Sequence, residues 1–357
     1  MNINIVFAVD DEGFDMMAVA LYSVIKNNQK HQLDFYVLHQ NISSQNISRL
    51  MKLENRFANT HIKPVVIDEK RLSNTETNNL YVTTEAYFRY LAPEILGDES
   101  RVLYMDFDML CISGIKELYG TDLEDDYLGA VADYVVEHKP AYRRFKDGIG
   151  FGKTEVYFNS GLLLLNLEKI RKNKVMEVFW DNLRDKNKII AKEFNFFADQ
   201  TVMNLTFRGK IKSLAAKNNV FTTVLEDTKQ KDPVIVHFTG MYKPLTYRNK
   251  HTAVYDDIYY TYYRECIEII GDDGGLLVKN MLKWLSRETR DRLKEIEAKN
   301  HQLDAMDAQI KGLTGHIATQ DTLIKSQNTQ LNSAIILQKR AIRLVLERAK
   351  KSKNKDS

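Results

Sequence analysis

Two aspartates separated by a single residue follow a short apolar stretch of the chain. Residues 102–105, Val-Leu-Tyr-Met, have the composition of a buried strand, and Asp106 and Asp108 come directly after it. Carboxylates one residue apart at a strand end can converge on one divalent cation, and oxygen ligands suit Mg²⁺ or Mn²⁺. The Asp-x-Asp pattern is common, so its position after a buried strand is what predicts a metal site.

A histidine follows another predicted strand, much later in the chain. His237 begins the stretch His-Phe-Thr-Gly-Met-Tyr-Lys-Pro, and a lone histidine in this position is more often a packed or capping residue. Neutral imidazole is nevertheless a good third ligand for Mn²⁺. Gly240 would let the backbone approach an anion closely, and Lys243 is a point charge suited to phosphate. The stretch is therefore consistent with a metal ligand followed by a diphosphate clamp.

Polar residues stand beside further predicted elements. Asn159 lies two residues before the strongest apolar run of the chain, Gly161 to Leu165, and Asp199 and Gln200 lie at the start of a predicted helix. Asp199 could cap that helix or bind a hydroxyl-rich ligand. Arg89 also lies in a predicted helix, where it could pair with a phosphate or a carboxylate or be an ordinary surface residue.

Apolar strands alternate with amphipathic helices before these residues. The alternation favours an open, largely parallel α/β sheet, in which ligands bind beyond the carboxyl ends of the strands. Residues 134–156 are polar and contain glycine, which suggests an exposed loop or lid, and residues 255–263 are rich in tyrosine. The predicted strands cover residues 3–9, 33–38, 62–67, 102–105, 128–132, 158–167 and 234–238. The predicted helices cover residues 14–27, 43–53, 84–96, 168–185 and 199–206.

The pattern changes after residues 271–275, a predicted linker of sequence Gly-Asp-Asp-Gly-Gly. Apolar residues then recur at intervals of seven, which predicts a helical segment over 276–334 with a short coiled coil that joins copies of the chain. The alternative is an amphipathic helix packed on its own N-terminal domain. Gly312 and Gly315 weaken the pattern. The repeating positions are Ile296, Leu303, Ile310, Ile317, Ile324 and Leu331.

The parts of the chain before and after the predicted linker also differ in net charge. Residues 276–357 contain 17 Lys and Arg against 9 Asp and Glu, whereas residues 1–275 contain 34 against 39. The last segment, 335–357, combines eight basic residues with apolar ones, which is typical of a helix on an anionic membrane surface; a solubilising tail is the alternative. The acidic N-terminal part argues against a nucleic-acid partner.

Composition excludes several classes of protein. The chain has 357 residues, 44% of them hydrophobic, which excludes wholesale disorder. Cys111 and Cys266 match neither a zinc-ligand spacing nor a secreted disulfide framework, so a reducing compartment is favoured. No apolar run approaches the roughly 20 residues of a membrane span, and the N-terminus lacks the basic region of a signal peptide. We therefore expect a cytoplasmic protein, with possible peripheral contact at the inner face of the membrane.

These motifs, in this order, resemble the retaining glycosyltransferases of family 8, with the bacterial lipopolysaccharide galactosyl- and glucosyltransferases as the nearest types. The resemblance covers roughly residues 1–265. Each motif is modest, and their shared order is what makes the resemblance specific. The matching segments are Phe-Ala-Val-Asp-Asp at 7–11, Tyr-Phe-Arg at 87–89, Leu-Tyr-Met-Asp-Phe-Asp at 103–108, Tyr-Phe-Asn-Ser-Gly at 157–161, Ala-Asp-Gln at 198–200 and the stretch at 237–244.

The resemblance implies a GT-A fold over residues 1–270, a mixed α/β sheet flanked by helices. It implies Mn²⁺, with Mg²⁺ possible, a UDP-hexose donor carrying glucose or galactose, and a glycan or glycolipid acceptor that receives an α linkage. Carried over, the metal ligands are Asp106, Asp108 and His237. Ala8 and Asp10 would hold the uridine, and Gly240 and Lys243 the diphosphate. Arg89, Asp133, Asn159, Asp199 and Gln200 would surround the transferred sugar.

Three segments depart from the family pattern. Glu12-Gly13-Phe14 replaces Asn-Tyr after the first aspartates, so the aromatic ring that should stack on uracil is missing or displaced to Phe14. Thr201 follows the Asp-Gln motif where Asp is frequent, and Leu245 replaces a Trp after Lys-Pro. These departures leave the class intact and leave the donor and the acceptor open.

In the mechanism that the resemblance implies, the acceptor hydroxyl attacks from the face that the diphosphate leaves, because the group on the opposite face is Gln200, a poor nucleophile. Two other classes stay open. One is a metal-dependent nucleotidyl or phosphoryl transferase, although no P-loop motif is present. The other is a non-catalytic scaffold. Within the family, a glucan-elongating α-glucosyltransferase is a further alternative.

Overall fold

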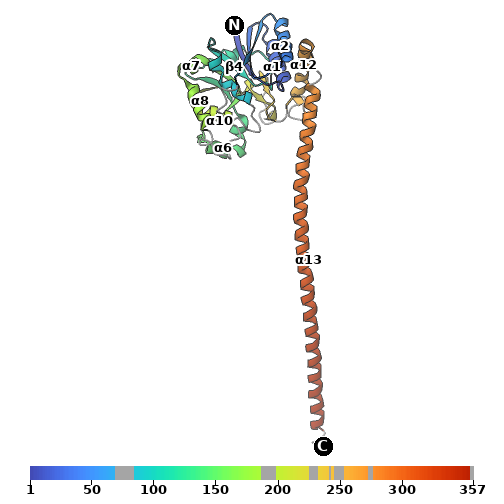
Figure 1. Cartoon of the computed structure of the whole chain (residues 1–357). Helices are drawn as coiled ribbons and strands as arrows, with labels where there is room; N and C mark the ends of the chain where they lie inside the picture. The colour runs from blue at the N-terminus through green and yellow to red at the C-terminus, as the bar shows by residue number, and fades with distance from the viewer. Residues whose placement is uncertain are drawn as a thin grey trace. The chain divides into compact units, whose positions relative to one another are not determined.

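A seven-stranded mixed sheet forms the centre of the N-terminal part of the chain (Figure 1). The computed structural model describes residues 1–68, 84–185, 198–224, 232–240, 243–244, 253–271 and 276–353. It divides into two compact units, residues 1–284 and 285–357. The strands lie in the order β3-β2-β1-β4-β7-β6-β8. Their bounds are β1 Asn2–Ala8, β2 Gln32–His39, β3 Thr60–Val66, β4 Arg101–Met105, β6 Leu128–Ala132, β7 Phe158–Asn166 and β8 Ile211–Ser213.

The direction of one strand makes the sheet mixed. β1 is parallel to β2 and β4, and β2 is parallel to β3, whereas β7 is antiparallel to both of its neighbours, β4 and β6. The expectation of a largely parallel sheet therefore fails at β7, because an apolar run does not reveal the direction in which a strand runs. β7 occupies an interior position, and residues 162–165 are buried on both faces, which explains its continuous apolar sequence.

Helices cover both faces of the sheet (Figure 1). Apolar residues of α1, α2 and α12 pack into the core on one face, while those of η2, α7, α8 and α10 pack into the core on the other. The bounds of the first set are α1 Phe14–Asn27, α2 Ser44–Arg56 and α12 Ala253–Ile270. Those of the second are η2 Thr84–Tyr90, α7 Leu167–Lys172, α8 Val175–Arg184 and α10 Ala198–Thr206.

A second, three-stranded sheet brings distant parts of the chain together. β10 lies between β5 and β9, antiparallel to β5 and parallel to β9. In this register His237 pairs with Met109, the residue after Asp108. The bounds are β5 Met109–Cys111, β9 Val220–Phe221 and β10 Ile235–His237, and the short helices nearby are α4 Lys116–Tyr119, η5 Ala216–Asn218 and η6 Thr222–Val224.

Two predicted elements differ in the structure. The expected loop or lid over 134–156 is largely helical, with Val136 and Phe145 buried. Its helices are α5 Tyr134–His138, η3 Pro140–Tyr142 and α6 Arg143–Gly148. The expected helix over 84–96 is divided into the 3₁₀ helix η2 and α3 Ala92–Ile95, because Pro93 is tolerated only in the first turn of a new helix.

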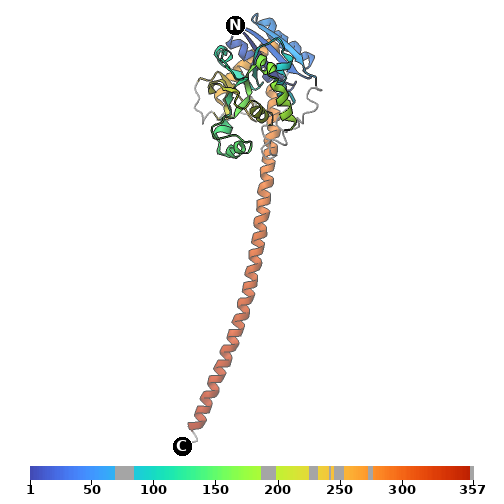
Figure 2. The same ribbon diagram turned by 90° about the vertical axis from the view of Figure 1, so that its left-hand side faces the viewer.

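The described residues of the C-terminal unit, 285–353, are part of one long helix, α13 Leu276–Lys353, which Figure 2 shows as a continuous ribbon. Gly312 and Gly315 lie within it without interrupting it. The repeating apolar residues from Ile296 to Leu331 are exposed, each by more than half of its surface. No described helix is long and apolar enough to cross a membrane. The coiled coil and the basic membrane-binding tail remain predictions, and most of the predicted linker lies outside the described residues.

Candidate active site

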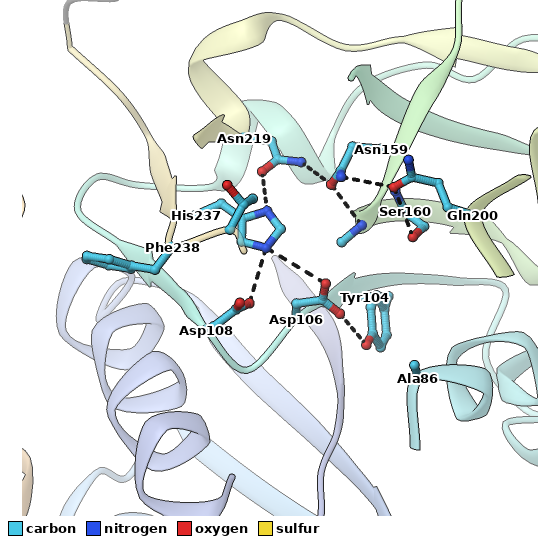
Figure 3. Close-up of polar contacts among 12 residues, drawn as sticks. Ala86, Tyr104, Asp106, Asp108, Asn159, Ser160, Gln200, Asn219, His237 and Phe238 are labelled. Atoms are coloured by element: carbon cyan, nitrogen blue, oxygen red, sulfur yellow. Dashed lines mark hydrogen bonds and ion pairs between the residues drawn. The ribbon is translucent and has the colours of Figure 1, made fainter. Parts of the chain in front are cut away.

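Three potential metal ligands meet at one edge of the two sheets (Figure 3). Asp106 follows β4, Asp108 precedes β5, and His237 ends β10. The Nε2 atom of His237 lies 3.1 Å from Oδ1 of Asp108 and 3.9 Å from Oδ2 of Asp106. One ligand atom from each residue lies within 4.8 Å of the others. The pairing of β5 with β10 thus brings together residues that are more than 120 positions apart in the sequence.

Two observations show that this group suits a divalent cation. Oδ1 of Asp108 is buried and has no hydrogen-bond partner among the described residues, although Nε2 of His237 lies 3.1 Å away. A Cβ atom on Gly161 would lie 2.5 Å from Cε1 of His237 and 2.7 Å from Oδ2 of Asp106, so only glycine leaves this space open. Two carboxylates and one imidazole are a suitable ligand set for Mn²⁺ or Mg²⁺.

Lys243 adds a positive charge on the other side of Asp108. Its ammonium group pairs with Oδ2 of Asp108 and donates a hydrogen bond of 3.1 Å to the carbonyl oxygen of Phe238. Burial disfavours the ionised form of Asp108, but the ammonium group of Lys243 holds the pKa of this carboxyl well below its usual range. Gly240, three residues earlier, has φ +73°, a conformation that favours glycine.

Arg89 is buried and connects several of these groups, so the alternative of an ordinary surface residue is wrong. Its Nη1 atom donates to the carbonyl oxygen of Ser160 at 2.6 Å and lies 3.3 Å from Oδ1 of Asp106. Its Nη2 atom lies 3.9 Å from Oδ2 of Asp199. Burial alone would lower the pKa of Arg89, but Asp106 and its other neighbours raise it, so this residue stays charged. Arg89 therefore places a fixed cation between the carboxylates.

Side-chain amides form the next part of the site. Asn159 donates through Nδ2 to Oε1 of Gln200 at 3.0 Å, and Nε2 of Gln200 donates to Oδ2 of Asp133 at 3.1 Å. The backbone N–H of Ser160 also donates to Oε1 of Gln200. Since a backbone N–H can only donate, it fixes which end of the Gln200 amide is oxygen. The amide of Gln200 is thus hydrogen-bonded through both its oxygen and its nitrogen.

The two buried aspartates of this part of the site differ in their surroundings. Asp133 caps α5 by accepting from the N–H groups of Val135 and Val136. Burial raises the pKa of Asp133, and these bonds together with one from Gln200 and one from Asn159 oppose the rise. Burial also raises the pKa of Asp199, with Arg89 opposing it. Asp199 lies in the first turn of α10, one residue after its start, so it is not the N-cap.

The predicted uridine residues make no contact with these groups among the interactions found in the described residues. Ala8 is buried at the end of β1, and Asp10 accepts a hydrogen bond from the N–H of Gly13 at 2.7 Å. Phe14 is 1% exposed, with the Arg49 guanidinium 5.1 Å from the centre of its ring. It packs into the core and is therefore not placed to stack on a base, so the suggested displacement of the aromatic to Phe14 is wrong.

Two residues of the site were not found by the sequence analysis. Tyr104 donates to Oδ1 of Asp106 at 2.7 Å and lies under the guanidinium of Arg89. Asn219 accepts from His237 and donates to Asn159, each at 2.9 Å. The only signal for Tyr104 was its place in the strand before the Asp-x-Asp motif. An asparagine before a short strand carries no comparable signal.

Comparison with known proteins agrees with this arrangement. The family model described as glycosyl transferase family 8 matches residues 4–247. A lipopolysaccharide 1,2-glucosyltransferase of Escherichia coli is 26% identical over 254 residues, covering 68% of this chain and 72% of that protein. A lipopolysaccharide 1,3-galactosyltransferase of Salmonella typhimurium is 25% identical over 251 residues, again covering 68% and 72%.

The fold has a counterpart among solved structures. The galactosyltransferase LgtC, solved in complex with donor and acceptor sugar analogues, has a TM-score of 0.62 and 24% identity, and the match covers 74% of this chain and 96% of that one. This likeness confirms the expected GT-A fold. The family match spans both sheets and every residue that we placed in the site, and the chain therefore belongs to glycosyl transferase family 8.

Proposed function

We propose that this chain is a metal-dependent, retaining glycosyltransferase that moves a hexose from a UDP-sugar to a hydroxyl group of a glycan and forms an α linkage. The observation that carries the proposal is the convergence of Asp106, Asp108 and His237 around a buried carboxylate oxygen that lacks a hydrogen bond. The relatives named as lipopolysaccharide glucosyl- and galactosyltransferases support glucose or galactose as the sugar and a lipopolysaccharide as the acceptor. A glycolipid or a glycoprotein glycan would offer the same hydroxyl chemistry.

The reaction breaks the bond between the anomeric carbon and a diphosphate oxygen, and the electron pair leaves with the diphosphate. A divalent cation held by Asp106, Asp108 and His237 would act as a Lewis acid where this negative charge develops. Lys243 adds a second positive charge beside Asp108. Such groups lower the barrier because they bind the charge of the transition state more strongly than that of the ground state.

The amides would hold the sugar while the bond breaks. Asn159, Gln200 and Asp133 present donors and acceptors suited to hydroxyl groups, and Asp199 would orient others beside Arg89. Gln200 is a poor nucleophile, and its Nε2 atom already donates to Asp133. We therefore infer that the acceptor oxygen attacks from the face that the diphosphate leaves. Its proton passes to a departing diphosphate oxygen, and the anomeric configuration is retained.

The test is release of UDP from UDP-glucose and UDP-galactose without acceptor, with Mn²⁺, with Mg²⁺ and with EDTA. We expect slow hydrolysis of one donor that requires the metal and is lost in Asp108→Ala. Asp98→Ala is the matched control, because Asp98 is exposed and lies outside the site. If no donor is turned over and UDP with Mn²⁺ does not bind, the proposal is wrong. Release of pyrophosphate or formation of a phosphoester would instead indicate a nucleotidyl or phosphoryl transferase.

The long helix supports a proposal about assembly. We infer that residues 296–334 join copies of the chain through the exposed apolar residues of α13, and that residues 335–357 contact an anionic membrane surface. The replacement Ile317→Asp should lower the mass of the particle measured by light scattering. Deletion of 335–357 should abolish binding to anionic vesicles and leave UDP-sugar hydrolysis unchanged. An unchanged mass, or unchanged vesicle binding, would contradict the respective inference.

A further inference from the structure

Asn219 lies between the predicted metal ligand His237 and the amides of the sugar site (Figure 3). It follows η5, precedes β9 and is 4% exposed. Its Oδ1 atom lies 2.9 Å from Nδ1 of His237, and its Nδ2 atom donates to Oδ1 of Asn159 at 2.9 Å. Both polar atoms of this buried side chain are thus hydrogen-bonded, the oxygen to His237 and the nitrogen to Asn159.

The direction of these hydrogen bonds follows from the backbone. The N–H of Gly161 donates to Asn159 at 3.0 Å, and a backbone N–H can only donate. The atom of Asn159 that receives it must therefore be oxygen. The atom of Asn219 that faces this oxygen must then be its nitrogen, and the oxygen of Asn219 faces His237.

This direction determines which nitrogen of the imidazole carries the proton. An amide oxygen can only accept, so Nδ1 of neutral His237 must be protonated to bond it. Nε2 then has a free lone pair, and it is the atom that points toward Asp106 and Asp108. In metal sites, the hydrogen bond made by the outer nitrogen of a histidine fixes its tautomer and orientation.

We propose that Asn219 is a positioning residue that holds His237 in the tautomer able to bind a metal and connects the metal ligands to the sugar-binding amides. The inference rests on the metal dependence of the proposed function. The connection continues through Asn159, whose Nδ2 atom donates to Oε1 of Gln200. If a bound sugar displaced Asn159, the movement would therefore be transmitted to His237 through one side chain, that of Asn219.

Three variants separate the two bonds of Asn219. Asn219→Ala removes both, whereas Asn219→Asp retains an acceptor for His237 and removes the donor to Asn159. Asn218→Ala is the matched control, since Asn218 is the adjacent residue of the same type, is 6% exposed and makes no side-chain hydrogen bond among the described residues. Two quantities are measured: the ¹⁵N chemical shifts of the His237 ring in metal-free protein, at a pH high enough for the ring to be neutral, and the dissociation constant of Mn²⁺ in the presence of UDP.

We expect wild type and Asn218→Ala to show His237 protonated on Nδ1 alone. Asn219→Ala should show a mixture of tautomers and bind Mn²⁺ about 10–100-fold more weakly. Asn219→Asp should retain the tautomer and bind Mn²⁺ within a few-fold of wild type, while its rate of sugar transfer falls further than its metal affinity.

The inference is overturned if His237 keeps the Nδ1-protonated tautomer and an unchanged affinity for Mn²⁺ in Asn219→Ala. If that variant does not fold, Asn219→Asp decides, because loss of the tautomer there would contradict the role of the acceptor. If the wild type binds no Mn²⁺, the metal dependence in the proposed function is wrong, and the ring shifts of the metal-free protein still decide whether Asn219 sets the tautomer.

Discussion

The two ends of the proposed site are built on different principles: a metal end of Asp106, Asp108 and His237, and a sugar end of Asn159 and Gln200. At the metal end, two carboxylates and an imidazole approach each other, and Oδ1 of Asp108 has no hydrogen bond among the described residues. At the sugar end, Asn159 and Gln200 are joined to each other and to the backbone by directed hydrogen bonds. On the proposed function, a cation would complete the first end, whereas the second is already satisfied and would have to exchange its hydrogen bonds for those of a sugar. We therefore expect changes at the metal end to have larger effects than changes at the sugar end.

The largest effect is expected from Gly161→Ala, which adds one methyl group between the two ends. The new Cβ would lie within 2.7 Å of Asp106 and closer still to His237, so the ligands must separate. We expect Mn²⁺ affinity to fall because the ligands are pushed apart, and turnover to fall by about 100-fold or more, a loss of the size seen when one transition-state contact is removed. Calorimetric titration and UDP release measure the two quantities.

Gly97→Ala is the control for this change, because no atom lies within 4 Å of the position that its Cβ would take. This variant should behave as wild type. If Gly161→Ala bound Mn²⁺ normally, the metal would not lie between Asp106 and His237. The metal site would then have to be formed by other residues.

Arg89→Lys tests the residue that touches both ends. The guanidinium faces Ser160 and Asp106 through Nη1 and Asp199 through Nη2, whereas a lysine has a single nitrogen. We expect turnover to fall by about 10–100-fold, since charge is retained and geometry is lost. A variant with wild-type turnover would show that Arg89 acts only through its charge.

Gln200→Leu should affect one end alone. It removes the acceptor for the Ser160 N–H and the donor to Asp133, which leaves buried polar groups without partners. We expect turnover to fall by about 10-fold and the free energy of unfolding by about 1–3 kcal/mol. Mn²⁺ affinity should stay within a few-fold of wild type. An equal loss of Mn²⁺ affinity and turnover would contradict the separation of the two ends.

The closeness of Asp106 and Asp108 could be predicted from the sequence, because the pair directly follows one apolar strand. Their meeting with His237 depends on the pairing of β5 with β10, which has no local signal. At the sugar end, position beside a predicted helix left helix capping and a hydroxyl-rich ligand both open, and only the resemblance assigned Asn159 and Gln200 to the sugar. Asn219 has no local pattern, since its partners lie 18 and 60 residues away and asparagine is common in turns.

Two errors in the predicted fold have similar origins. Strand β7 was recognised from its apolar residues, but strand direction depends on the connections between strands, which periodicity does not report. The sequence of residues 134–156 suggests a loop because their helices are short and bury few residues, among them Val136 and Phe145, so no amphipathic period can develop.

The smallest effect is expected from a surface ion pair that belongs to neither end. Arg208 pairs with Glu155 and lowers the pKa of this carboxyl from 4.5 to about 2. Because the pKa is lower in the folded state, the pair stabilises the fold above the pKa of the unfolded chain. That contribution disappears as the pH falls from 4.5 toward 2. Glu155→Gln should therefore lower the thermal midpoint at neutral pH, by no more than about 3 °C.

The difference between wild type and Glu155→Gln should shrink as the pH is lowered to about 3, and UDP release at neutral pH should be unchanged. A difference that stays constant with pH would mean that the carboxylate charge contributes nothing. Altered UDP release would mean that this ion pair, which lies on the segment leading into β7, helps to position Asn159. Such a result would mean that the sugar end of the site includes this surface ion pair. We expect no such effect, because the pair belongs to neither end.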